Sequence, residues 1–256
     1  MKGKFTQYLA GSAAGILFAA APAFAADLAP APVAPPPPPF TWTGFELGLD
    51  VGGGVETSNV NLFELYNFSD TYNGTGPFGG LHLGFNYQLS GPFVVGVQAE
   101  YNFAGITGNA SAAPLYYLTT SVREFGSVDA RAGLAFDRLL VYAIGGFAYG
   151  DIRNQVNFQF FPTSVTGFPV TRDFASNRYG WDVGGGLEYA FWGNVTARIE
   201  YRYYDFGTRG YNDAGFGNPI TIAIPNHTTR ETMQTGRIGL TYKFASPFTS
   251  PLVAKY

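Results

Sequence analysis

The chain has 256 residues, no cysteine and a formal net charge of −3 at neutral pH. The absence of cysteine excludes thiol catalysis, cysteine-ligated zinc and disulfide bonds, and the mildly acidic balance argues against a nucleic-acid partner. A content of 17% aromatic residues, 34 glycines and only 13% charged residues favours one twisted all-β domain with many tight turns.

The N-terminus has the pattern of an export signal. Two lysines near the start are followed by an apolar run over residues 9–21, and Ala23 and Ala25 supply a small-x-small cleavage site. We therefore expect residues 1–25 to be a signal peptide. A membrane anchor is the weaker alternative, because the run is shorter than the roughly 20 residues of a spanning helix. Later apolar stretches are interrupted by glycine or by polar residues, so a membrane assignment must rest on strands.

Residues 26–39 follow as a proline-rich segment, with five consecutive prolines at 35–39. Proline has no backbone N–H donor and favours the polyproline II conformation. We expect a stiff periplasmic leader between the cleavage site and the first strand. A ligand for a proline-binding module is the alternative.

From residue 40 onward, the sequence predicts eight strands that are each long enough to cross a hydrocarbon layer as a tilted β-strand. The predicted strands cover residues 42–54, 77–89, 92–103, 121–136, 139–150, 177–190, 195–206 and 231–244. Their connections alternate between tight turns, near residues 90–91, 137–138 and 192–194, and long polar segments at 55–76, 104–120, 151–176 and 207–230. This alternation is typical of an antiparallel up-and-down outer-membrane barrel with long extracellular loops, here spanning residues 40–244 and followed by a tail at 245–256.

The last predicted strand has one apolar face and one polar face. Ile238, Leu240, Tyr242 and Phe244 point one way, and the residues between them point the other. The order polar, any, Gly, any, any, aromatic, any, aromatic resembles the terminal β-signal read by the barrel assembly machinery, with the positions filled by Arg237, Gly239, Tyr242 and Phe244. In the families with this signal it ends the chain, whereas twelve residues follow it here.

Charged residues recur on the polar face of the strands, and an eight-stranded barrel is just wide enough to be filled by side chains. We predict a buried charge network in the lumen made of Glu46, Glu100, Asp129, Arg131, Asp182, Glu188, Arg198, Glu200, Arg202 and Arg237. Asp50, His82 and Lys243 share this face. A lone buried ion costs several kcal/mol, so these charges should pair and plug the bore. A narrow or gated channel is the main alternative, and a catalytic carboxylate or base is a remote one.

Evidence for an enzyme is weak. His82 and His227 are the only histidines, and their spacing does not suggest a shared metal site. His227 with Asp205 or Asp213 on a rim remains a remote catalytic possibility. We expect no enzymatic activity, no cofactor and no metal.

Several segments together resemble one protein family. A leader that begins Ala-Asp-Leu at residue 26 is followed by Phe-Thr-Trp-Thr-Gly-Phe-Glu-Leu-Gly over residues 40–48, and further matching segments lie at 142–150, 200–205 and 253–256. This pattern resembles the small, porin-like outer-membrane immunogenic proteins of alphaproteobacteria across the whole mature chain. The resemblance implies an eight-stranded barrel related to the OmpA transmembrane domain, tied to envelope integrity and surface exposure.

We therefore expect a non-enzymatic barrel in the outer membrane of a Gram-negative cell, with both termini in the periplasm. Its expected partners are outer-membrane lipid, lipopolysaccharide and the barrel assembly machinery, and its long loops form the variable contact surface. A narrow or gated porin for small solutes is the alternative function. A soluble lipocalin-like carrier would need the charged face of each strand to point outward.

Overall fold

The computed structural model describes residues 40–62, 68–112, 116–158, 170–211 and 227–244. Within these ranges the chain forms eight strands: β1 (Gly44–Leu62), β2 (Phe68–Gln88), β3 (Phe93–Ala112), β4 (Tyr116–Phe136), β5 (Leu139–Phe158), β6 (Val170–Trp192), β7 (Val195–Tyr211) and β8 (His227–Lys243). None of these residues belongs to a helix that is long and apolar enough to cross a membrane.

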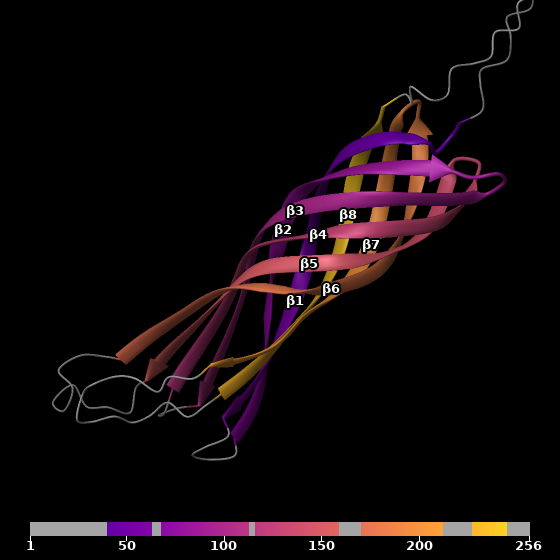
Figure 1. The fold of residues 1–256 in the computed structure, drawn as a ribbon. Helices are drawn as coiled ribbons and strands as arrows, with labels where there is room; N and C mark the ends of the chain where they lie inside the picture. The colour runs from indigo at the N-terminus through magenta and orange to yellow at the C-terminus, as the bar shows by residue number, and fades with distance from the viewer. Residues whose placement is uncertain (1–39, 63–67, 113–115, 159–169, 212–226, 245–256) are drawn as a thin grey trace, which may run out of the picture. The chain divides into compact units, whose positions relative to one another are not determined.

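The strands form one closed barrel (Figure 1). Each strand pairs antiparallel with the next in the chain, and β1 closes the sheet by pairing with β8 from Glu46↔Lys243 to Leu62↔His227. Because closure leaves no unpaired edge, every strand has a hydrogen-bonded neighbour on both sides. The predicted fold class, an eight-stranded antiparallel up-and-down barrel, is confirmed.

Three tight turns join β2 to β3, β4 to β5 and β6 to β7, where the sequence predicts them. Each contains a residue with positive φ: Gly91 at 81°, Asp137 at 55° and Gly193 at 50°. Glycine adopts this conformation without steric cost, and Asp tolerates it better than most residues. These turns define one end of the barrel, which we call the turn end, and the opposite end is the loop end.

The strands are longer at the loop end than the sequence predicts. Residues 55–62, 68–76, 104–112, 116–120, 151–158, 170–176, 207–211 and 227–230, which were expected to lie in loops, belong to strands. Outward Asn and Thr side chains pair across these extensions, as Thr57 does with Asn73 at 2.9 Å and Thr71 with Asn59 at 2.7 Å. The strands therefore continue beyond the apolar part of the outer surface. There the outward face is polar and the inward face mixes apolar residues such as Val60 with polar ones such as Ser58, so the alternation that marks the strand nearer the turn end is lost.

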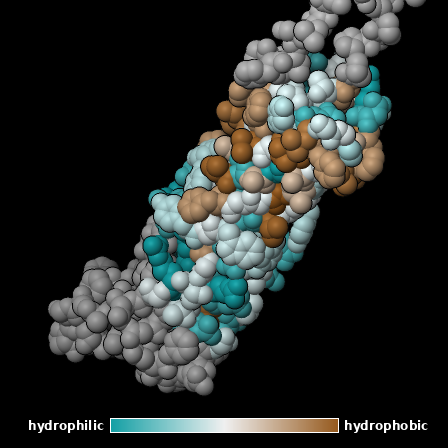
Figure 2. All heavy atoms as spheres, turned by 45° about the vertical axis from the view of Figure 1, so that its right-hand side comes forward, coloured by the Kyte–Doolittle hydropathy of each residue, from teal (hydrophilic) through white to brown (hydrophobic). Residues whose placement is uncertain are grey.

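The outer surface of the barrel carries an apolar belt nearer the turn end. Leu49, Val97, Val128 and Ile199 are each at least 55% exposed, although they are large aliphatic residues. The face in Figure 2 shows apolar side chains mainly toward the turn end and polar ones toward the loop end. Such a belt on a closed barrel matches the surface that hydrocarbon chains cover in an outer membrane.

Inward glycines make room for large polar side chains on the neighbouring strands. Gly48 lies opposite His82, and a β-carbon on Gly48 would overlap the imidazole ring. Gly239 lies between Asp50 and Arg198 in the register, and a β-carbon there would overlap the Asp50 carboxylate. Small and large residues thus alternate around the lumen, which lets side chains fill the bore of a small barrel.

Candidate functional site in the lumen

Two apolar layers bracket the charged part of the lumen. The turn-end layer contains buried Trp42, Val94, Ala135, Leu140, Tyr142 and Ile144, with Phe40 packed against it. The loop-end layer contains buried Phe78, Ile106, Val122, Phe125, Ala148, Ile152, Tyr204, Phe206 and Met233. On β7, for example, Arg198, Glu200 and Arg202 precede Tyr204 along the chain. The ionisable side chains between these layers therefore lie in a space walled by apolar side chains at both ends.

Trp42 is fully buried at the turn end. Its indole Nε1 donates to the carbonyl of Asp137 at 3.1 Å, and its ring meets Phe40 edge to face at 5.0 Å between centroids. The Lys243 ammonium donates to the carbonyl of Thr41 and lies 4.6 Å above the Phe40 ring. These contacts attach residues 40–42 to the end of β8 and to the turn between β4 and β5.

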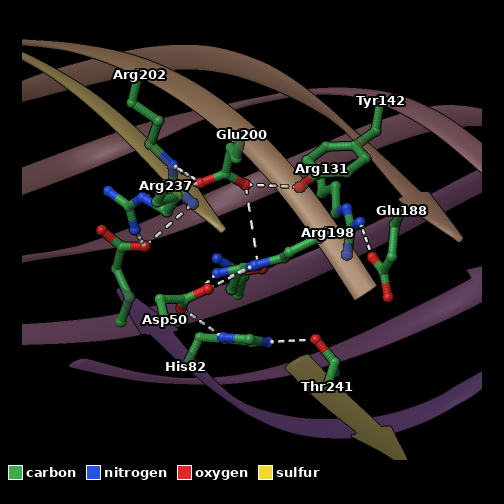
Figure 3. Close-up of polar contacts among 12 residues, drawn as sticks. Asp50, His82, Arg131, Tyr142, Glu188, Arg198, Glu200, Arg202, Arg237 and Thr241 are labelled. Atoms are coloured by element: carbon green, nitrogen blue, oxygen red, sulfur yellow. Dashed lines mark hydrogen bonds and ion pairs between the residues drawn. The ribbon is translucent and has the colours of Figure 1, made fainter. Parts of the chain in front are cut away.

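Arg131 connects the turn-end layer to the charge network (Figure 3). Its Nη1 donates to Glu46 at 3.1 Å, and its Nη2 donates to Glu188. The guanidinium also lies 3.6 Å from the centre of the Tyr142 ring. Two carboxylates and a ring face thus stabilise one cation that is 3% exposed.

Arg202 is the most connected cation in the lumen. It donates to Glu200 at 2.7 Å through Nε, and to Asp129 at 2.6 Å and Asp182 at 3.0 Å through Nη1. Its Nη2 lies 3.3 Å from Glu100. Four strands contribute to these contacts, so the network holds distant parts of the barrel together.

Arg237 joins the charge network to the loop-end layer. It donates to Glu100 at 2.5 Å and to the Tyr204 hydroxyl at 2.7 Å, and it lies 3.5 Å from Glu200. Its guanidinium faces the ring of Phe78 at 5.1 Å. The hydroxyl of Tyr204 therefore belongs to the polar network while its ring packs in the apolar layer.

Asp50, His82 and Thr241 form a hydrogen-bonded row, visible in Figure 3. His82 Nδ1 lies 2.7 Å from Asp50, and His82 Nε2 lies 3.0 Å from the Thr241 hydroxyl. Acid, imidazole and hydroxyl follow one another as in a hydrolase triad, but all three side chains are at most 2% exposed. Arg198 also binds both oxygens of Asp50, at 2.9 and 2.7 Å. A nucleophile must reach its substrate, so this burial favours a structural role.

All ten residues of the predicted charge network lie in the lumen, each at most 5% exposed. Asp50, His82 and Lys243 lie there too. The sequence interpretation missed the two inward tyrosines, Tyr142 and Tyr204, which supply hydroxyl groups to the network. Tyr204 shares the parity of Arg198, Glu200 and Arg202 on β7, so period-two spacing could have found it. Tyr142 stands on a strand whose two faces are both largely apolar, so its direction could not be predicted.

A second buried polar cluster, also missed, lies beyond the loop-end layer. Glu231 accepts a hydrogen bond from Ser58 at 3.1 Å and lies 3.6 Å from Arg178. Glu56 is fully buried beside them, and neither of its carboxylate oxygens accepts a hydrogen bond from a donor among the described residues. Glu56 was placed in a loop by the sequence, so its inward direction could not be read.

The predicted assembly signal runs from inward Arg237 and Gly239 in the second half of β8 to outward Tyr242 and Phe244 at the turn end. Tyr242 and Phe244 are 49% and 45% exposed on the outside and meet edge to face at 5.1 Å. Phe244 also donates its backbone N–H to Phe45 at 2.8 Å. The predicted cleavage residues, Ala23 and Ala25, lie outside the described ranges.

The remote catalytic candidates are not brought together by the described structure. Asp205 accepts a hydrogen bond from Arg230 at 2.6 Å, while Asp213 and the side chain of His227 lie outside what the structure describes. Among the described residues, no group of three or more His, Cys, Asp or Glu side chains could hold a metal ion.

Comparison with known proteins gives the same architecture. A family model described as outer membrane protein beta-barrel domain matches residues 11–245. The chain is 32% identical to the 31 kDa outer-membrane immunogenic protein of Brucella melitensis, over 84% of this chain and 88% of that protein. It is 30% identical to the 22 kDa outer membrane protein of Rhizobium leguminosarum, over 71% of this chain and 73% of that protein. Among solved structures, OprG from Pseudomonas aeruginosa aligns with a TM-score of 0.47 and 13% identity, over 80% of this chain and 98% of that one.

Proposed function

Because this chain belongs to the family of outer-membrane β-barrel domain proteins, we propose that it is a non-enzymatic barrel whose lumen is closed by its own side chains. In this function it contributes to envelope integrity and meets its surroundings through the four connections at the loop end. One observation carries the proposal: a mutually paired charge network fills the lumen between two apolar layers.

Closure follows from the electrostatics of the two layers. An ion that moves along the bore must give up water where the lining is apolar, and this costs several kcal/mol unless protein groups replace the water. The groups that could do so, such as Arg202 and Glu100, already neutralise each other at 3.3 Å. The lumen therefore favours a stable plug over a path for ions.

The barrel's orientation follows from its even number of strands and its unequal ends. We place the three tight turns and both chain termini in the periplasm, and the loop end at the cell surface. The expected partners follow from this placement: outer-membrane lipid and lipopolysaccharide around the belt, and the barrel assembly machinery during insertion.

Planar-bilayer recording of the refolded full chain tests the proposal. We expect no steady single-channel current for the wild type in 1 M KCl, a condition of roughly 3 Å Debye length that weakens long-range charge effects. Steady conductance of the wild type would overturn the closed-lumen proposal.

A narrow or gated passage is the second candidate, favoured by polar atoms in the charged layer that lack a partner among the described residues. They include Asn102 Oδ1, Asp129 Oδ1 and Asp182 Oδ1. Buried polar groups of this kind commonly bind water. Voltage- or pH-dependent openings in the same recordings, with a silent ground state, would favour this candidate.

A further inference from the structure

We propose that the outer surface of β3, β4 and β5 binds the phosphate group of an outer-leaflet glycolipid between Arg123 and Arg153. The inference deepens the proposed function and rests on its orientation, in which the loop end faces the cell exterior.

Aromatic side chains mark the edge of the apolar belt on this side of the barrel. Tyr101 meets Phe103 edge to face at 4.9 Å, and its ring centre lies 6.3 Å from that of Tyr149 on β5. Phe147 stacks on Tyr179 at 5.9 Å and continues the row onto β6. Aromatic residues collect where hydrocarbon meets headgroups, so this row indicates the depth at which lipid phosphates lie.

A bulge in β4 places a cation directly beyond this row. The register between β4 and β5 shifts between Val122 and Glu124, so Arg123 is the extra residue and is exposed on the outside. Arg153 stands on the adjacent strand opposite Ser121, with a side chain that is 50% exposed. Bulges re-aim side chains, and here the result is two outward guanidinium groups on neighbouring strands.

The two nearby carboxylates are already engaged. Glu124 accepts the hydrogen bond of the Tyr101 hydroxyl, and Asp151 lies 3.4 Å from Nε of Arg153. Among the described residues, Arg123 has no ion-pair partner. Arg123 can therefore bind an anion without breaking an existing pair, and Arg153 can offer its terminal nitrogens while Nε faces Asp151.

The opposite side of the barrel provides a matched contrast. Arg230 on β8 also faces outward and is 54% exposed, but its Nη2 already binds Asp205 at 2.6 Å. Aromatic residues lie on this side too: Tyr203 on β7 pairs with Gln234 of β8, and its ring centre lies 5.8 Å from that of Trp181. Both sides thus have outward aromatic residues, but only the β3–β5 side has a cation without an ion-pair partner among the described residues, whereas Arg230 is already paired.

The acyl chains of a glycolipid distinguish its phosphate group from a free phosphate ion at this site. A lipid phosphate is held beside the barrel by its own acyl chains against the apolar belt, so two exposed arginines suffice to select it. A free ion would have only two exposed cations, and exposed pairs contribute about 0–1 kcal/mol each.

The test measures binding of diphosphoryl lipid A to the refolded full chain in zwitterionic micelles, by titration of tryptophan fluorescence or of thermal unfolding. We expect the double variant Arg123→Ala, Arg153→Ala to weaken binding about thirtyfold, and Arg123→Lys to retain most of it. Arg230→Ala is the matched control and should stay within about twofold of the wild type. Dephosphorylated lipid A should bind all four proteins alike.

Three outcomes would overturn the inference. The first is unchanged lipid A binding in the double variant, and the second is an equal loss in Arg230→Ala, which would show a diffuse charge effect. The third is inorganic phosphate that binds as tightly as lipid A, which would make the site one for free anions. Failure of the proposed function is separate, because it would appear as wild-type conductance or as protease cleavage of the tight turns from outside.

Discussion

Glu200 connects several members of the charge network in the lumen. It accepts hydrogen bonds from Tyr142 and Arg202, both at 2.7 Å, and it lies 3.5 Å from Arg237. Its neighbour in sequence, Ile199, points to the outside and is 55% exposed. Two adjacent residues of one strand therefore have opposite surroundings, which makes them a matched pair for mutation.

Replacing Glu200 with leucine should destabilise the barrel or admit water. The change leaves arginines buried with fewer partners, and breaking a fully buried pair costs about 3–5 kcal/mol. Ile199→Ala should cost less, because lipid or detergent can fill the gap it leaves. Urea unfolding and single-channel recording of both refolded variants check this, and equal midpoints with no current for either would contradict it.

Gly48 should be intolerant of any side chain, because His82 occupies the space where its β-carbon would lie. Gly48→Ala should displace the imidazole from Asp50 and Thr241, at a cost of about 1–3 kcal/mol for overpacking. Gly53→Ala is the control: it lies on the outer face of the same strand, and the nearest atom to its β-carbon would be 3.8 Å away. Urea unfolding should separate the two variants, and a Gly48→Ala barrel as stable as Gly53→Ala would refute the packing argument.

Individual inward residues could be predicted wherever a strand alternates cleanly. Arg198, Glu200 and Arg202 are separated by single apolar residues, so their common direction follows from the period of a strand. Which acid meets which base could not be predicted, because Asp50 and Arg198 are 148 residues apart and meet only through closure of the sheet.

Strand β8 contributes both to the lumen and to the outer surface of the barrel. Its inward residues complete the lumen, and its outward Tyr242 and the next residue after the strand, Phe244, are exposed aromatic residues at the turn end. Strand β8 also closes the barrel against β1, so its correct placement decides whether the sheet becomes a barrel.

Changing Tyr242 or Phe244 to alanine should impair assembly more than changes in residues 245–256. Aromatic residues at the end of a strand anchor at the interface, and the two rings occupy the aromatic positions of the β-signal pattern. The yield of folded, heat-modifiable barrel in outer-membrane fractions measures the effect. Equal yields for both variants, for tail variants and for the wild type would exclude a role for these rings in assembly.

Bulges explain part of what the sequence did not reveal about the strands. In β4, Val122 and Phe125 both point inward although they differ by three positions, because the register shifts between Val122 and Glu124. A strict period of two assigns one of them to the wrong face. The extensions at the loop end were missed for a different reason: their outward face carries Asn and Thr, and their inward face mixes polar and apolar residues, so the two faces show no constant contrast.

For the whole molecule, the unequal ends of the barrel give a topology that protease can test. Protease added to intact cells should cut only in the loop-end connections at residues 63–67, 113–115, 159–169 and 212–226, which the strand bounds define. Asn61, Ala110 and Gln155 lie in segments that the sequence predicts as loops, but they belong to β1, β3 and β5 and should be protected. Mass spectrometry of the fragments reads out the positions, and external cleavage near Ser90 or Asp137 would reverse the orientation.

The row from Asp50 through His82 to Thr241 also bears on how the barrel folds. Asp50 belongs to β1 and Thr241 to β8, so the row crosses the place where the first and last strands meet. Arg198 adds β7 to the same group. Until β8 docks, these charged groups have no complete set of partners, and a partly closed sheet would expose them to the bilayer interior. Because these stabilising contacts form only when β8 docks, closure and unfolding of the barrel should each proceed as a single cooperative step. Closure should be slow, as expected for contacts between distant parts of a chain.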